Sequence, residues 1–444
     1  MKKMLKKVVA LALMLTLLVA SAPQMIAHGA YIPQGDGFDA FHNALVAEYG
    51  LDFAINYRQA LEIANNIHDN FPRNRMGDVM YPENFGGMYI DEFGNLNVLI
   101  VISNMASISA FNDNLALPNE REVAYSYNDL WGTMNSLNEL IGERAGACYI
   151  VANVDYWYLD VIGNRVVIAL FDFNQSAIDI FKRNILDSTI IAFAESTGEI
   201  VETSQYINPV SDNTYTYPVY YEGYVEIAQS NIVHVFSGEY IRVIRNGAHI
   251  GGGSIGYRAN LGSLNGFITA AHLASAHGNL RMGDNIFNGA GQLIGRVSNT
   301  SHLRLNDVDA AFITTQPNVM FNSWCNLHGQ NIMEWRTPSI IAGTRAIMDG
   351  YRTGPRIGSI TAVGISVNFS GFTVTNAVRT NITSHAGDSG GIAYMFNHSS
   401  DSGVLGIAIG GSNAGYTWNG IRIVTNTVFS RADNINRTLG ARMP

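Results

Sequence analysis

The stretch NITSHAGDSGGIAYMF, residues 381–396, places a serine hydroxyl on a tight turn between glycines. Alone it decides little, because the chain has 44 glycines in 444 residues and such turns are ordinary in a glycine-rich sequence. A serine becomes a nucleophile only when a general base accepts its proton and a third group orients that base. The interpretation of Ser389 therefore depends on whether the rest of the chain supplies both groups.

Two stretches upstream carry a candidate base and a candidate orienting group. NGFITAAHLASAHG (265–278) is typical of a strand that ends in two alanines and His272, where small neighbours leave room for another segment to approach the ring. NDVDAAFITT (306–315) places Asp309 at the start of an apolar strand. A carboxylate buried there is costly unless it is paired, and an imidazole N–H would satisfy it. The order His, Asp, Ser, each in a fitting context, favours a catalytic triad.

The motifs TAAH (269–272), DAAFI (309–313) and GDSGG (387–391) resemble those of chymotrypsin-like serine proteases. The likeness is greatest to the secreted bacterial branch, the α-lytic protease and streptogrisin family. It covers residues 231–440 well and residues 85–200 loosely, where that branch carries a pro-segment. The family fold implied for the C-terminal region is an all-β double β-barrel.

The resemblance implies a role for each matching residue. Ser389 is expected to be the nucleophile, His272 the general base and acid, and Asp309 the group that orients His272. The backbone N–H groups of Gly387 and Ser389 are expected to form the oxyanion hole, where a side chain at 387 would crowd the donor. Asp307 is the alternative third member, but it would place Asp309 where the family has a small apolar residue.

The same resemblance locates a specificity pocket and two departures. The pocket residues are expected to be Thr383, Ser384, His385 and Arg422. Thr383 stands where trypsin-like members carry an acid, so cleavage after Lys or Arg should be poor. His385 or Arg422 would favour an acidic substrate residue, unless Arg422 points to solvent. Leu273 replaces the cysteine that usually follows the catalytic histidine, and the cysteine usually found near the serine loop is also missing.

The first thirty residues are typical of a secretion signal. Four lysines precede an apolar run from Val8 to Ala20, which is followed by small residues. The run has about 13 residues, fewer than the roughly 20 that a membrane-spanning helix needs. We therefore expect an exported protein, extracellular or periplasmic according to the producing cell, with no membrane attachment after signal cleavage.

Charge divides the remaining chain into two halves. Residues 31–230 hold 27 acidic and 8 basic side chains, a net charge of −19, and residues 231–444 hold 9 and 15, a net charge of +6. Opposite charge favours two units that attract each other, although each half could simply have its own solubility balance. The two cysteines, Cys148 and Cys325, fall in different halves, and we expect them to be unpaired.

The acidic half contains an internal repeat. YIDEFGNLNVLIV (89–101) aligns without a gap with YLDVIGNRVVIAL (158–170), and the Asp…Gly-Asn element of each predicts a hairpin turn. Helical periodicity follows each copy, at 126–142 and 175–186, and a further helical segment is predicted over 41–71. The repeat predicts two small α/β units, about 85–145 and 150–200.

These observations predict a multi-domain chain: signal peptide 1–30, α/β pro-domain 31–203, linker and processing region 204–230, and trypsin-like protease domain 231–444. The expected function is that of a secreted serine endopeptidase, made as a pro-enzyme whose acidic pro-domain assists folding and inhibits. Its expected partners are protein or peptide substrates and its own pro-domain in cis. No metal spacing or nucleotide fingerprint is found, so no cofactor and no nucleic acid are expected. The alternative is a catalytically silent relative that binds peptides or extracellular partners.

Overall fold

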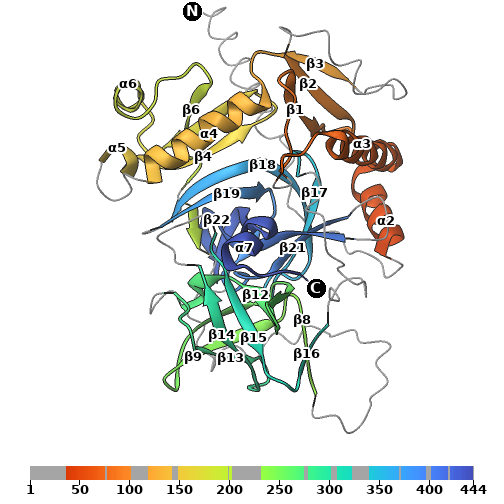
Figure 1. The fold of residues 1–444 in the computed structure, drawn as a ribbon, viewed down its shortest axis with the longest axis vertical. Helices are drawn as coiled ribbons and strands as arrows, with labels where there is room; N and C mark the ends of the chain where they lie inside the picture. The colour runs from red at the N-terminus through yellow and green to blue at the C-terminus, as the bar shows by residue number, and fades with distance from the viewer. Residues whose placement is uncertain are drawn as a thin grey trace, which may run out of the picture.

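The computed structural model describes residues 37–75, 78–101, 119–142, 149–198, 200–202, 232–274, 279–301, 308–322, 340–369, 372–396, 402–418 and 421–443. We call the described residues up to 202 the N-terminal part and those from 232 onward the C-terminal part. Figure 1 shows the N-terminal part above, the strands of residues 345–431 in the middle, and the strands of residues 233–322 below. None of the described helices is long and apolar enough to cross a membrane.

The helical segment predicted over 41–71 forms two helices, α2 (Gly37–Tyr49) and α3 (Leu51–Asn70). They are separated at Gly50, whose φ of 91° is a left-handed conformation that glycine adopts without strain. The buried side chains of α3 recur every three or four residues, which places them on one face. They are Phe53, Ala54, Tyr57, Ala60, Leu61, Ala64 and Ile67. α3 contacts two strands of the N-terminal part.

Both copies of the sequence repeat form antiparallel hairpins. The strands are β1 (Phe85–Ile90) with β2 (Leu96–Val101), and β4 (Val154–Asp160) with β5 (Arg165–Leu170). Each hairpin gains a parallel third strand, β3 (Glu120–Val123) or β6 (Ile191–Glu195). The helices differ in order, because α4 (Tyr127–Gly142) follows β3, whereas α6 (Gln175–Asn184) precedes β6. The two units therefore share their hairpins but not their complete chain order.

The lower strands of the C-terminal part form a seven-stranded antiparallel sheet in the order β10-β9-β13-β14-β15-β12-β11. The strands are β9 (Tyr240–Arg245), β10 (Ala248–Ser254), β11 (Arg258–Leu261), β12 (Leu264–Thr269), β13 (Asn285–Asn288), β14 (Leu293–Thr300) and β15 (Ala311–Thr315). Beside it, β8 (Val233–Phe236) pairs in parallel with β16 (Val319–Asn322). These elements agree with the β-rich fold that the resemblance implied for the C-terminal region.

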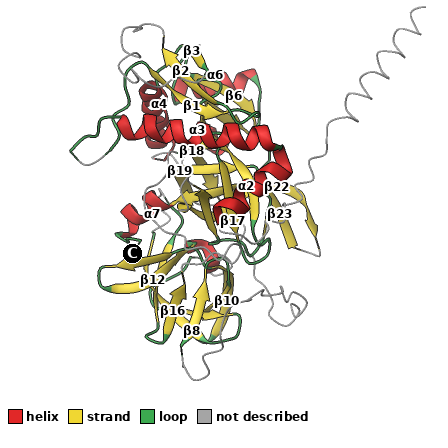
Figure 2. Cartoon of the chain, turned by 90° about the vertical axis from the view of Figure 1, so that its right-hand side faces the viewer, coloured by secondary structure: helices red, strands yellow, loops and turns green. Residues whose placement is uncertain are grey.

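The remaining strands join the two parts of the chain into one eleven-stranded sheet. Its C-terminal strands are β17 (Arg345–Asp349), β18 (Arg356–Phe369), β19 (Phe372–Thr380), β20 (Ser384–His385), β21 (Ile392–Phe396), β22 (Ser402–Trp418) and β23 (Ile421–Arg431). The sheet crosses into the N-terminal part where β18 pairs with β4. A short strand, β7 (Ile200–Glu202), pairs with β22. The view in Figure 2 shows the helices of the N-terminal part beside this sheet.

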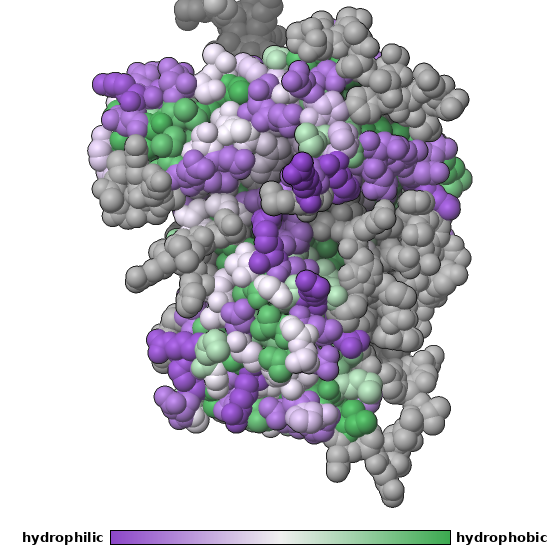
Figure 3. Space-filling model, in the orientation of Figure 1, coloured by the Kyte–Doolittle hydropathy of each residue, from purple (hydrophilic) through white to green (hydrophobic). Residues whose placement is uncertain are grey.

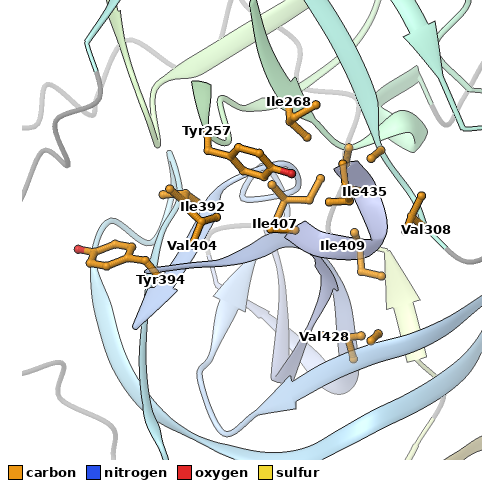
Figure 4. Packing of buried hydrophobic residues seen from close by; sticks show 14 of the residues in the cluster. Tyr257, Ile268, Val308, Ile392, Tyr394, Val404, Ile407, Ile409, Val428 and Ile435 are labelled. Atoms are coloured by element: carbon orange, nitrogen blue, oxygen red, sulfur yellow. The ribbon is translucent and has the colours of Figure 1, made fainter. Parts of the chain in front are cut away.

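A shared apolar core joins the lower sheet to the middle one. Figure 4 shows Tyr257 and Ile268 facing Ile407 and Ile435, and all four side chains are buried. Ile435 comes from α7 (Ala432–Leu439), which follows the last strand. Hydrophilic and hydrophobic residues are interspersed on the described surface of one face (Figure 3). Because burial of apolar area holds the two sheets together, residues at their junction are fixed relative to one another.

Candidate active site

His272 stands at the end of a strand of the lower sheet. β12 ends at Thr269, two alanines follow, and His272 lies in the short 3₁₀ helix η2 (Ala271–Ala274) with 1% of its surface exposed. Both preceding alanines are fully buried. The small side chains expected to make room for another segment are therefore packed beside the imidazole.

Asp309 is fully buried and lies two residues before β15, as expected for an acid at the start of an apolar strand. Its Oδ1 accepts hydrogen bonds from the backbone N–H groups of Ala271, at 2.8 Å, and His272, at 3.1 Å. Its Oδ2 forms a short contact with Nδ1 of His272. These three partners replace the water that the carboxylate loses on burial. The same contacts fix both the backbone and the ring of His272.

Ser389 lies on the turn between β20 and β21, and it is fully buried. Its Oγ is 2.7 Å from Nε2 of His272, so one imidazole contacts a carboxylate on one side and a hydroxyl on the other. Two glycines shape the turn, Gly387 with φ of 111° and Gly390 with φ of 86°. A Cβ on Gly390 would lie 2.2 Å from Oγ1 of Thr269, so only glycine lets the serine turn approach the histidine strand.

The carboxylate of Asp388 holds the serine turn from within. Its Oδ1 accepts from the backbone N–H groups of Arg352, at 2.7 Å, and Thr353, at 3.0 Å. Its Oδ2 accepts from the backbone N–H of His385, at 2.7 Å, and from the Thr353 hydroxyl. A buried carboxylate with four donors is well satisfied, and it ties the serine turn to residues 352–353. This contact set gives Asp388 a structural role in the serine turn.

Ser254, which the sequence motifs did not indicate, connects the serine turn to the lower sheet. Its hydroxyl donates to the carbonyl oxygen of Gly387 at 2.9 Å, and its backbone N–H donates to that of Ser389 at 2.8 Å. Its own carbonyl oxygen accepts from the Thr269 hydroxyl at 2.8 Å. Ser254 therefore links the histidine strand and the serine turn. No sequence pattern marks it, because its contacts with the serine turn join residues more than 130 positions apart.

A serine hydroxyl, an imidazole and a buried carboxylate in series form the arrangement that the three motifs predicted. The chain resembles bacterial chymotrypsin-like proteases. Residues 128–196 match the family model described as a Pro-like C-terminal domain.

Three solved structures illustrate the likeness. Chymotrypsin of Cellulomonas bogoriensis is 26% identical, with 48% of this chain and 98% of that chain covered and a TM-score of 0.36. The Nocardiopsis protease NAPase is 20% identical, with 47% and 98% covered and a TM-score of 0.36. Protease A of Thermobifida fusca is 21% identical, with 47% and 98% covered and a TM-score of 0.34. No curated protein matches the chain. The resemblance to proteases of this type with a pro-segment is confirmed.

The residues expected in the specificity pocket lie partly together. Ser384 is fully buried, and its hydroxyl accepts from that of Thr427 at 2.9 Å. Nδ1 of His385 is 2.8 Å from the Thr353 hydroxyl, so this ring contributes to the support of the serine turn. Thr383 immediately precedes β20 and is half-buried. The backbone of Arg422 lies in β23, which pairs with β20 through the two residues that follow it, but its side chain is outside the described residues.

Two further carboxyls lie near the serine turn and were not expected from the sequence. Asp349 is buried, and its Oδ2 has no hydrogen-bond partner. Burial, together with the nearby charges of Asp388 and Glu239, raises the pKa of Asp349 to about 7. Burial also raises the pKa of Glu239 to about 7, against the effect of the Phe236 N–H that donates to it. Both groups therefore hold a proton at mildly acidic pH.

Several sequence-based expectations fall on residues outside the described part of the chain. They are the signal at 1–30, the linker at 204–230, Asp307 and the two cysteines, Cys148 and Cys325. Among the described residues, no group of His, Cys, Asp or Glu is arranged to hold a metal ion.

Proposed function

We propose that the chain is a serine endopeptidase in which Ser389, His272 and Asp309 act as a triad. The observation that carries this proposal is the 2.7 Å approach of His272 Nε2 to Ser389 Oγ, with the Asp309 carboxylate at the other ring nitrogen. These buried groups lie within hydrogen-bond distance of one another, as proton transfer requires. A structural hydrogen bond to a serine would need neither the carboxylate nor the glycines that bring the turn so close.

The proposed reaction begins when Ser389 Oγ attacks the carbonyl carbon of a peptide bond and His272 Nε2 takes the hydroxyl proton. Asp309 holds the Nδ1 proton and stabilises the imidazolium. The N–H groups of Gly387 and Ser389 stabilise the charge that develops on the carbonyl oxygen. His272 then gives its proton to the leaving amine, which breaks the peptide bond and leaves an acyl-serine. Water, activated by the same imidazole, hydrolyses the acyl group.

The architecture proposed for this chemistry is that of two β-barrels, one from the seven-stranded sheet and one from β17 to β23. His272 and Asp309 belong to the first and Ser389 to the second, and Ser254 and the shared core support their alignment. The active site then lies at the junction between the two sheets. Catalytic groups that rigid elements hold in position need little further ordering when the reaction begins.

We also propose that the N-terminal part is a pro-domain that restrains the enzyme. Its β4 extends the sheet at β18, and Asn138 of α4 accepts hydrogen bonds from Trp157 Nε1, at 2.8 Å, and Ser366 Oγ, at 2.7 Å. Ser366 belongs to the C-terminal part, so this amide joins the two parts. A Cβ on Gly364 would lie 2.6 Å from the Trp131 ring, which shows how closely α4 and β18 pack.

The strand β7 supports direct restraint of the site. β22 bonds to the serine turn at Ala408, whose N–H and carbonyl pair with Gly391 and Gly390. Two residues further along, Gly410 lies opposite Glu202 of β7. The N-terminal part thus pairs with β22 close to the nucleophile, on a strand edge where an extended peptide could pair instead. Export, cleavage between residues 204 and 230, and action on extracellular proteins complete the proposal.

Hydrolysis of a peptide library by purified protein tests this function and its specificity. Wild-type chain should cleave peptides, and Ser389→Ala and His272→Ala should not. Cleavage after Lys or Arg should be poor, because nothing at Thr383 would neutralise a buried cation. An unchanged rate in Ser389→Ala would reject the enzyme proposal, and strong cleavage after Arg would reject the pocket assignment alone.

A further inference from the structure

The N-terminal part places aromatic rings on two arginines of the C-terminal part, on one from its first two helices and on the other from its second α/β unit. We infer that the pro-domain recognises the protease through two arginine side chains, Arg345 and Arg379, which its aromatic rings clamp. The inference rests on the proposed restraint and names the surface that carries it. The contact surface on the N-terminal part is aromatic, and the group that it binds on the C-terminal part is a planar cation.

Arg345 is held by the first helices. It begins β17 and is 8% exposed. Its guanidinium carbon is 4.0 Å from the ring centroid of Tyr49 and 5.0 Å from that of Phe53. The Tyr57 hydroxyl accepts from the Arg345 backbone N–H at 2.7 Å. A cation over desolvated ring faces gains electrostatic attraction, and a guanidinium can also stack on the rings.

Within the described part of the chain, hydrogen bonds satisfy the Arg345 guanidinium only in part, so the rings matter. Its Nη1 donates to the Ser359 hydroxyl, whereas its buried Nε has no hydrogen-bond partner. Burial raises the pKa of Tyr49 to about 12, so that ring stays neutral and keeps the electron-rich face a cation needs. Stacking is therefore a main source of stabilisation for this buried charge.

Arg379 is held by the second unit in a similar way. It lies on β19, with its guanidinium carbon 4.9 Å from the ring centroid of Tyr158 and 5.2 Å from that of Tyr156. Both tyrosines belong to β4, the strand that continues the sheet across the boundary. The two arginines thus contact the N-terminal part at two separate places on the middle sheet.

Ion pairs do not join the parts in the described chain. Each ion pair between two described side chains lies within one part, namely His68–Asp69, Lys182–Asp187, Arg245–Asp284, His272–Asp309 and Arg431–Asp433. The large opposite net charges can steer approach over distance, but salt screens that effect. The buried guanidinium of Arg345 is screened far less, so its contact with the rings should persist at high ionic strength.

Hydrogen exchange on the full-length chain tests the clamp, with Ser389→Ala as background so that no self-cleavage occurs. Arg345→Met should raise amide exchange in α3 on the order of tenfold, the change that about 1.4 kcal/mol of lost contact produces. Arg345→Lys should also raise it, because an ammonium lacks the planar stack. Arg296→Met, which removes an exposed arginine of β14, is the matched control and should leave α3 unchanged.

A second pair of variants guards against misfolding at Arg345. Tyr49→Phe keeps a ring and should exchange like the background, and Tyr49→Leu should resemble Arg345→Met. Protection of α3 should be the same at 50 mM and 1 M NaCl. Three results would each overturn the inference. They are equal protection of α3 by lysine and arginine at position 345, equal protection by leucine and phenylalanine at position 49, and loss of this protection in salt. Because the background lacks the nucleophile, these outcomes are independent of peptide hydrolysis, whose absence in wild-type chain would instead reject the proposed function.

Discussion

Asp309 illustrates how one buried group organises the candidate site. It binds the backbone N–H groups of Ala271 and His272 as well as the imidazole, so its loss would affect both ring position and ring tautomer. We predict that Asp309→Asn lowers turnover about 10⁴-fold, because an amide favours the wrong imidazole tautomer. Steady-state hydrolysis by purified variant measures this loss. Near-normal turnover in Asp309→Asn, with loss in Asp307→Asn, would mean that Asp307 is the third member.

The buried carboxyl of Asp349 predicts a pH dependence of stability. Its pKa is about 7 in the folded chain against an ordinary value of 3.8, so the folded state holds the proton more tightly than the unfolded state. Stability should therefore fall as the pH rises from about 4 to about 7, and then level off. Asp349→Asn removes this penalty. Its melting temperature should exceed that of the parent at pH 8 by several degrees more than at pH 5.

Thermal unfolding of the Ser389→Ala chain with and without Asp349→Asn measures this difference. Asp172→Asn, at an exposed acid, is the control and should show no such trend. A difference in melting temperature that is the same at both pH values would show that Asp349 is ionised throughout.

At the scale of elements, β7 and β22 make a contact that a single substitution can prevent. A Cβ on Gly410 would lie 2.4 Å from the carbonyl oxygen of Val201, so Gly410→Ala cannot keep this pairing. We predict that fresh Gly410→Ala precursor reacts with a small serine-directed fluorophosphonate on the order of tenfold faster, as a weakening of about 1.4 kcal/mol implies. Gly289→Ala, where the nearest atom to the new Cβ is 3.9 Å away, is the control. Equal rates in both variants would show that β7 does not restrain the site.

Local patterns predicted the elements well where periodicity was strong. Helical spacing over 126–142 and 175–186 corresponds to α4 and α6, and the Asp…Gly-Asn turns correspond to the two hairpins. The break at Gly50 and the differing helix order were not foreseen. Nor was the continuous sheet, because strand pairing between β4 and β18 joins residues about 200 positions apart and leaves no mark in either sequence.

The candidate site shows the same division. His272, Asp309 and Ser389 are named by short motifs, and the structure brings all three together. Their support could not be predicted, because Ser254 and Thr353 act through contacts that only the tertiary fold creates. A lone serine or threonine in a β-rich chain carries no signal of such a role.

At the scale of the whole molecule, the two parts share a sheet and differ in charge. A mostly β domain has many non-local contacts and folds slowly, so a partner that binds only its folded form stabilises it. We predict that residues 231–444 expressed alone yield little active enzyme. Residues 31–230 added as a separate chain should restore folding and then inhibit the product until they are degraded. Full activity of 231–444 without help, and no binding by 31–230, would make the N-terminal part an independent domain.

The central claim is that Ser389 is an activated nucleophile. A fluorophosphonate reacts with a serine only when a base and an oxyanion site activate its hydroxyl. Mass spectrometry of labelled, purified chain should locate one phosphonate on Ser389, with none in Ser389→Ala and a greatly slowed reaction in His272→Ala. Absence of label on Ser389 after prolonged incubation, or equal labelling of the alanine variant, would contradict the account.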